Sequence, residues 1–97
     1  MFYDKYLDEF YLEELFDNYD TNYLKNIDHN NFEEIYQLLK KYNFDYIDDI
    51  ILEYLDIFTL PKEKVEEKIL NLQKALGKDY VEIIGDDISY LEYITKQ

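Results

Sequence analysis

The chain contains no cysteine, no arginine and no tryptophan, and its 97 residues include only two glycines and one proline. The absence of cysteine excludes disulfide bonds and metal sites built on thiolates. The scarcity of glycine and proline disfavours a strand-rich fold, because such a fold needs many tight turns. Small secreted domains are often held together by disulfides, so this composition favours an intracellular protein.

Long hydrophobic segments are also missing. The longest apolar runs, such as Ile50 to Leu52, are far too short to span a bilayer. The N-terminal residues, Met1 to Lys5, show neither the basic segment nor the apolar stretch of a signal peptide. An acidic surface is repelled by anionic lipid headgroups. We therefore expect a cytoplasmic protein without a membrane partner.

Positive charge is scarce, since ten lysines face 23 aspartates and glutamates, for a formal net charge of −13. The excess is uneven: residues 1–60 hold 15 acids and 4 lysines, whereas residues 61–97 hold 8 acids and 6 lysines. No basic residue lies between Tyr42 and Pro61. Because like charges destabilise a compact chain by self-repulsion, so strong a bias suggests that the charge has a use.

Aromatic residues are abundant, with 12 tyrosines and 6 phenylalanines in a chain that is 47% hydrophobic. High net charge with low hydrophobicity would predict disorder, but this composition can build a core. Hydrophobic periodicity predicts a first helix over 3–17 and a second over 32–42, started by the polar pair Asn30–Asn31. Between them we expect a polar connection with one helical turn, 22–27, capped by Thr21.

The middle of the chain predicts two further helices. Residues 46–58 repeat apolar pairs at helical spacing, and Asp45 is placed to cap this helix. The next helix has Pro61 in its first turn, with Leu60 or Thr59 as its cap, and ends at Gly77.

The tail is ambiguous, because two structures fit residues 80–95. Segments 80–84 and 88–94 suit two short helices, with Asp79 and Asp86 placed as N-caps. Their β-branched residues and the intervening Gly-Asp turn equally suit a β-hairpin. Capping favours the helices.

The predicted fold is all-α, a small compact bundle of four to six helices, with a β-hairpin as the alternative for the tail. Residues 1–97 are expected to form a single acidic helical domain. No repeat period is evident along the whole chain, although residues 60–93 resemble one helical repeat of the mitochondrial-terminator type.

The sequence contains no complete catalytic or metal-binding motif. The segment 18–29 begins like a calcium loop, but Tyr23 stands where glycine is needed and His29 where glutamate is needed. His29 is the only histidine, and we expect it to be exposed in a loop. Ser89 has no base nearby in the sequence, and no phosphate loop is present. We predict a non-enzymatic protein without a cofactor or metal.

The tyrosines have two interpretations. Tyr6, Tyr36 and Tyr54 occupy apolar positions of the helical pattern, where they suit the edge of a core with a hydrated hydroxyl group. Twelve tyrosines exceed what such a core needs, and tyrosine often anchors protein interfaces. The candidates for an exposed contact surface are Tyr19, Tyr23, Tyr42, Tyr46 and Tyr90.

The acidic stripes also have two interpretations. In one, they are solvated helix faces that confer solubility. In the other, rows of carboxylates imitate a phosphate backbone and bind a basic groove. The absence of lysine between positions 42 and 61 favours binding, since one lysine would relieve the repulsion within that helix. The predicted partner-binding residues are Asp8, Glu9, Glu13, Asp17, Asp20, Asp45, Asp48, Asp49, Glu53 and Asp56.

The chain is small and acidic, and it is rich in lysine, asparagine, isoleucine, tyrosine and phenylalanine, whose codons are AT-rich. In these respects it resembles the phage anti-CRISPR and anti-restriction proteins that mimic DNA. This resemblance is compositional and spans the whole chain. It implies an inhibitor of a host-defence nuclease, which binds a basic protein and no nucleic acid directly. One alternative is an immunity protein or antitoxin that neutralises a basic toxin. A second is an aromatic-rich assembly module, for which a homodimer is expected.

Overall fold

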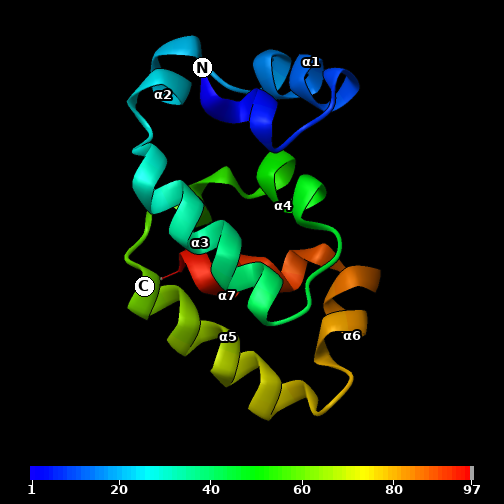
Figure 1. Ribbon diagram of the computed structural model, residues 1–97. Coiled ribbons are helices and arrows are strands. Elements are labelled where there is room, and N and C mark those ends of the chain that lie inside the picture. The colour runs from blue at the N-terminus through cyan, green and yellow to red at the C-terminus, as the bar shows by residue number, and fades with distance from the viewer. Residues whose placement is uncertain (97) are drawn as a thin grey trace.

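The computed structural model describes residues 1–96, and within that range every element of regular secondary structure is a helix (Figure 1). The prediction of an all-α fold is therefore confirmed, and the β-hairpin alternative for the tail is wrong over the residues described. The α-helices of residues 1–96 number seven, one more than predicted, and 3₁₀ helices separate several of them. The elements are η1 (Phe2–Lys5), α1 (Glu9–Asn18), α2 (Thr21–Asn26), α3 (His29–Lys41), α4 (Ile47–Glu53), η2 (Leu55–Thr59), α5 (Lys62–Leu76), α6 (Tyr80–Asp86), η3 (Ile88–Leu91) and α7 (Glu92–Thr95).

The first predicted helix, 3–17, is two elements. Asp8 has an extended backbone, with φ −76° and ψ 176°, and its side chain accepts a hydrogen bond from the Tyr11 amide. This N-cap starts α1 and separates it from η1, because an N-cap residue does not have helical backbone angles. Each piece can then bury its own residues, Tyr3 from η1 and Leu15 from α1.

Aspartates, and not the predicted residues, cap the next two helices. Asp20 caps α2 by accepting from the Asn22 amide, so Thr21 is the first helical residue. Asp28 caps α3, which begins at His29 and is longer than expected. His29 is therefore half-buried in a helix, and its ring stacks on that of Phe2 with centroids 4.2 Å apart.

The predicted helix 46–58 breaks at Tyr54, whose φ of −135° and ψ of 46° lie outside the helical region. The break turns η2 so that Leu55, Ile57 and Phe58 are all buried, which one straight α-helix could not achieve. Asp45 does not cap α4, because Tyr46 occupies that position and no side chain bonds there.

Of the caps predicted for the last helices, only Gly77 is confirmed. Gly77 ends α5 with a φ of +87°, which confirms the predicted C-cap. Pro61 is itself the residue before the first helical position. Asp79 precedes α6 without a side-chain bond, and Asp86 is the final residue of α6 and not a cap. Asp87 caps η3 by accepting from the Ser89 amide.

A repeat that the sequence analysis did not find is evident in the element order. α5, α6 and η3 begin at 62, 80 and 88, each 33 residues after α3, α4 and η2 at 29, 47 and 55. α3 and α5 contact each other and run side by side in Figure 1. Residue type changes at several equivalent positions, which conceals the period in the sequence. The buried equivalents are Phe32 and Val65, Leu39 and Leu72, Ile47 and Tyr80, Ile51 and Ile84, and Phe58 and Leu91.

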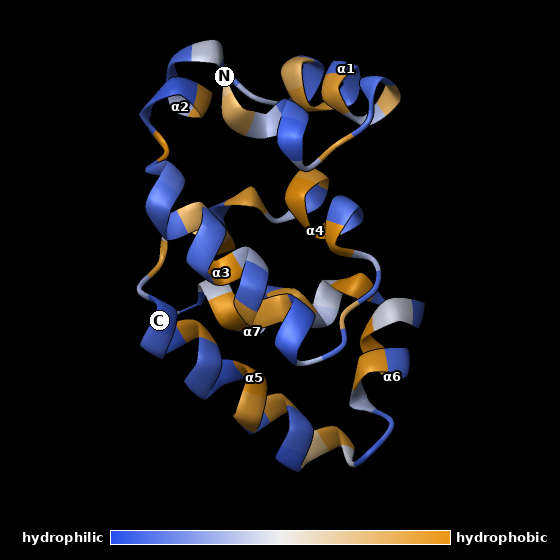
Figure 2. Ribbon diagram, in the orientation of Figure 1, coloured by the Kyte–Doolittle hydropathy of each residue, from blue (hydrophilic) through white to orange (hydrophobic). Residues whose placement is uncertain are grey.

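The core is one apolar cluster to which every helix described contributes. Within residues 1–96 no polar or charged residue is buried. Phe32 lies at its aromatic centre, stacked on Phe58 with centroids 4.5 Å apart. The hydrophobic faces of the helices point inward in Figure 2. A radius of gyration of 13.1 Å is that of a compact chain of this length.

Candidate acidic interaction surface

Two of the acidic segments, α1 and α4, lie against each other, although about 30 residues separate them in the chain (Figure 1). The contact is anchored at one end by Tyr11, whose hydroxyl donates a hydrogen bond of 3.2 Å to Asp49 Oδ1. The pKa of Tyr11 is raised, first by the charge of Asp49 and then by this hydrogen bond, with further contributions from Asp48 and Asp8. The fold therefore gathers three predicted carboxylates around one phenol.

A second anchor joins α2 to η2. The Tyr23 hydroxyl donates a hydrogen bond to Asp56. The pKa of Tyr23 is raised by burial, by this hydrogen bond and by the charge of Asp56. Burial also raises the pKa of the neighbouring Tyr19, and the charges of Asp56 and Glu53 add to the effect. The acidic residues of α4 and η2 thus lie beside Tyr11, Tyr19 and Tyr23 of the segment that contains α1 and α2.

Tyrosine, and not lysine, is the usual partner of carboxylates in this structure. Four tyrosines donate to four carboxylates, while the one ion pair among residues 1–96 joins Lys41 to Glu66 at 3.5 Å. A phenol holds a carboxylate in place without cancelling its charge. The tyrosine hydroxyls are also the largest cause that lowers the pKa of Glu33 and of Glu66. The four pairs are Tyr6–Glu33, Tyr11–Asp49, Tyr23–Asp56 and Tyr42–Glu66.

This role corrects the interpretation of the tyrosines as an exposed contact surface. Of the five candidates, only Tyr90 is exposed, and Tyr19, Tyr23, Tyr42 and Tyr46 are half-buried against the core. Tyr46 donates a hydrogen bond of 2.7 Å to the Val81 carbonyl. Three of these tyrosines, Tyr23, Tyr42 and Tyr46, are used for hydrogen bonds within the chain.

All ten predicted binding residues are exposed, but they do not form one uniform surface. Asp8 and Asp20 are N-caps, so their side chains stabilise the starts of α1 and α2. Glu9, Glu13 and Asp17 follow one another at intervals of four along the outer side of α1, about 6 Å apart along the helix axis. Asp45 lies away from this row, in the turn between α3 and α4.

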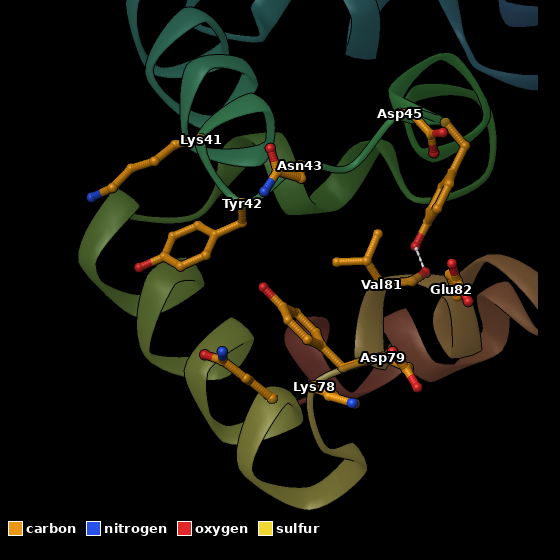
Figure 3. Close-up of a pocket in the computed structure, with 11 residues that line it drawn as sticks. Lys41, Tyr42, Asn43, Asp45, Lys78, Asp79, Val81 and Glu82 are labelled. Atoms are coloured by element: carbon orange, nitrogen blue, oxygen red, sulfur yellow. Dashed lines mark hydrogen bonds between the residues drawn. The ribbon is translucent and has the colours of Figure 1, made fainter.

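Asp45 borders an open cavity of about 560 Å³ between the α3–α4 turn and the α5–α6 turn, which occupy equivalent places in the repeat (Figure 3). Lys41 and Lys78 line the same cavity. Charges of both signs are mixed there, so Asp45 does not extend the purely acidic surface. We define the acidic face by the remaining exposed carboxylates of α1, α4 and η2: Glu9, Glu13, Asp17, Asp48, Asp49, Glu53 and Asp56.

The chain was compared with protein-family models, with curated proteins and with solved structures. None of these matches it. Within residues 1–96, no three histidine or acidic side chains lie close enough together to hold a metal ion. None of the helices described has the length and apolar character needed to cross a membrane.

Sequence reasoning missed two residues of this region, Phe10 and Phe16. In the predicted helix 3–17, both belong to the pairs of apolar residues that give the segment its helical period. The structure nevertheless leaves 66% of Phe10 and 44% of Phe16 exposed. The stripe that packs on the core is Tyr11, Leu12 and Leu15, at helical spacing. A strict period of 3.6 residues excludes Phe10 and Phe16 from the buried stripe. This mismatch is the feature of the sequence that could have predicted their exposure.

The Tyr23–Asp56 bond can be tested by the substitution Tyr23→Phe. We expect it to lower the free energy of unfolding by about 1 kcal/mol, because it removes one hydrogen bond to a carboxylate that solvent partly screens. Urea denaturation followed by circular dichroism measures the change. The control is Tyr36→Phe, since the Tyr36 hydroxyl makes no hydrogen bond to the residues described. Equal losses in the two variants would contradict a stabilising role for the bond.

Proposed function

We propose that this protein is a non-enzymatic inhibitor that binds a basic, nucleic-acid-binding surface of another protein, such as a CRISPR complex or other defence nuclease. The observation that supports the proposal is the contact between α1 and α4. It places two carboxylate-rich segments side by side, and the Tyr11 hydroxyl bonds to Asp49 across that contact. Tyr23 of α2 bonds to Asp56 of the adjoining η2, so tyrosines and not lysines hold both carboxylates. Full negative charge is thereby presented on a rigid surface.

Rigidity and charge together suit a mimic of nucleic acid. A duplex carries one charge per about 1.7 Å of axis, and proteins bind it through lysine and arginine contacts that depend strongly on salt. A helix that presents a carboxylate every turn offers a sparser row of the same sign. Because Tyr11 and Tyr23 fix Asp49 and Asp56, less side-chain entropy is lost when a partner binds.

The test is competition with DNA for purified defence nucleases, with association rates measured across a range of salt concentrations. We expect the protein to displace DNA from its target. Its association rate should fall at least about tenfold between roughly 50 and 200 mM salt, because the encounter is steered by charge. The protein alone should not shift DNA or RNA in a gel, since phosphates would meet carboxylates.

Two results would overturn the proposal. One is direct binding of nucleic acid by the protein alone. The other is tight binding to a target at a rate that salt does not change and without competition from DNA, which would favour an interface dominated by apolar contacts.

A further inference from the structure

The outer side of α1 carries two exposed phenylalanines as well as acids. Phe10 is 66% exposed and Phe16 44%, whereas the exposed large apolar side chains at the C-terminal end, Leu70, Tyr90 and Tyr93, are only 38–39% exposed. An exposed phenylalanine has no polar atom to hydrate, so it gains more than a tyrosine from being covered by a partner.

The helical geometry interleaves these rings with the acids. Six residues separate Phe10 from Phe16, which corresponds to about 9 Å along the axis and roughly 120° around it. At about 100° per residue, Glu9, Glu13 and Asp17 fall in the sector between the two rings. The face of α1 turned away from the core is therefore a row of carboxylates with an aromatic ring on each side.

We propose that this face of α1 docks into a single-stranded nucleic-acid groove of the partner, in which cations alternate with aromatic rings. The inference rests on the proposed function and deepens it. Grooves that bind single strands combine a positive track for the backbone with aromatic side chains on which bases stack. Glu9, Glu13 and Asp17 take the place of phosphates, and Phe10 and Phe16 take the place of stacked bases.

The charge of α1 favours this partner over the others that could cover an exposed apolar face. A second copy of the chain would bring the same three carboxylates against their equivalents, in a molecule of net charge −13. Anionic lipid would be repelled for the same reason. A duplex-binding surface that contacts only phosphates would leave both phenylalanines in water, so it would not use the exposed aromatic rings of α1.

The test uses two synthetic peptides of equal positive charge, one of lysine alone and one in which lysine alternates with tryptophan. The protein has no tryptophan, so the fluorescence of the second peptide reports its binding directly, and the lysine peptide is measured by competition. We expect the wild-type protein to bind the lysine–tryptophan peptide at least about tenfold more tightly, as expected for stacking on two rings. The double variant Phe10→Ala, Phe16→Ala should lose this preference and still bind the lysine peptide.

The matched control is Leu70→Ala with Tyr90→Ala, which removes exposed apolar groups elsewhere and should keep the preference. If wild type binds both peptides equally, or if the phenylalanine variant keeps the preference, the inference fails and the proposed function stands. If neither peptide binds, both fail. Sedimentation supplies a last check: a wild-type dimer that the phenylalanine variant does not form would identify a self-interface and overturn the inference.

Discussion

Reversing the charge of Glu13, Asp17, Asp48 and Glu53 to lysine is expected to slow association with a basic target by about 100-fold, because electrostatic steering contributes factors of this size. The four residues are exposed, come from both α1 and α4, and neither cap a helix nor accept a tyrosine hydroxyl. Asp49 and Asp56 are left unchanged because Tyr11 and Tyr23 bond to them. The fold should persist, since the reversals reduce the self-repulsion of the acidic face.

A matched variant separates local from global charge. Reversal of Glu63, Glu67, Glu82 and Asp86 changes the net charge equally on exposed positions of α5 and α6. Association rates of both variants with the same target are measured by surface plasmon resonance, and circular dichroism confirms that each is folded. We expect the control to slow association only modestly. If both variants slow it alike, total charge and not the acidic face governs binding.

Raising the pH above 10 is expected to unfold the protein cooperatively, which is the largest effect we expect on stability. Nine tyrosines have a raised pKa, with that of Tyr3 raised by burial to about 12 from an ordinary 10.0. Between the unfolded and folded pKa values, the unfolded chain binds fewer protons than the folded one, so stability falls as pH rises. Below pH 10 this contribution is fully present.

The hydrogen bonds from tyrosines to carboxylates make this alkaline unfolding more cooperative. When Tyr11 or Tyr23 ionises, a donor becomes an anion beside Asp49 or Asp56, and attraction becomes repulsion. Tyrosinate absorbance and circular dichroism, recorded together against pH, should change in one cooperative step. Protein unfolded in denaturant serves as the control and should titrate smoothly near pH 10. Independent titration of all twelve tyrosines with the helices intact would refute the prediction.

Much of the fold could be predicted because its signals are local. The period of apolar residues located most of the helices, and Gly77 marked the end of α5. Cap positions were less certain, because neighbouring polar residues compete for the same amides. Asp20 capped α2 in place of Thr21, and Asp28 capped α3 in place of the asparagines that follow it. Such errors shift a boundary by one to three residues without changing the layout.

The breaks within helices depend on distant residues. The turn at Tyr54 lets η2 bury Ile57 and Phe58 and pack on α3, α4 and α7. The positions of those helices make the arrangement favourable. The repeat of 33 residues is hidden in the sequence for a related reason: burial is kept at equivalent positions, while residue type changes at several of them, as at Phe32 and Val65.

The sequence by itself determined the helical class, the charge of −13 and its concentration before residue 61. Tertiary structure alone decided that α1 lies on α4, that tyrosines hold carboxylates of α4 and η2, and that Phe10 and Phe16 remain uncovered. The physical reason is that periodicity shows which residues share one side of a helix. It does not show which other element, if any, covers that side.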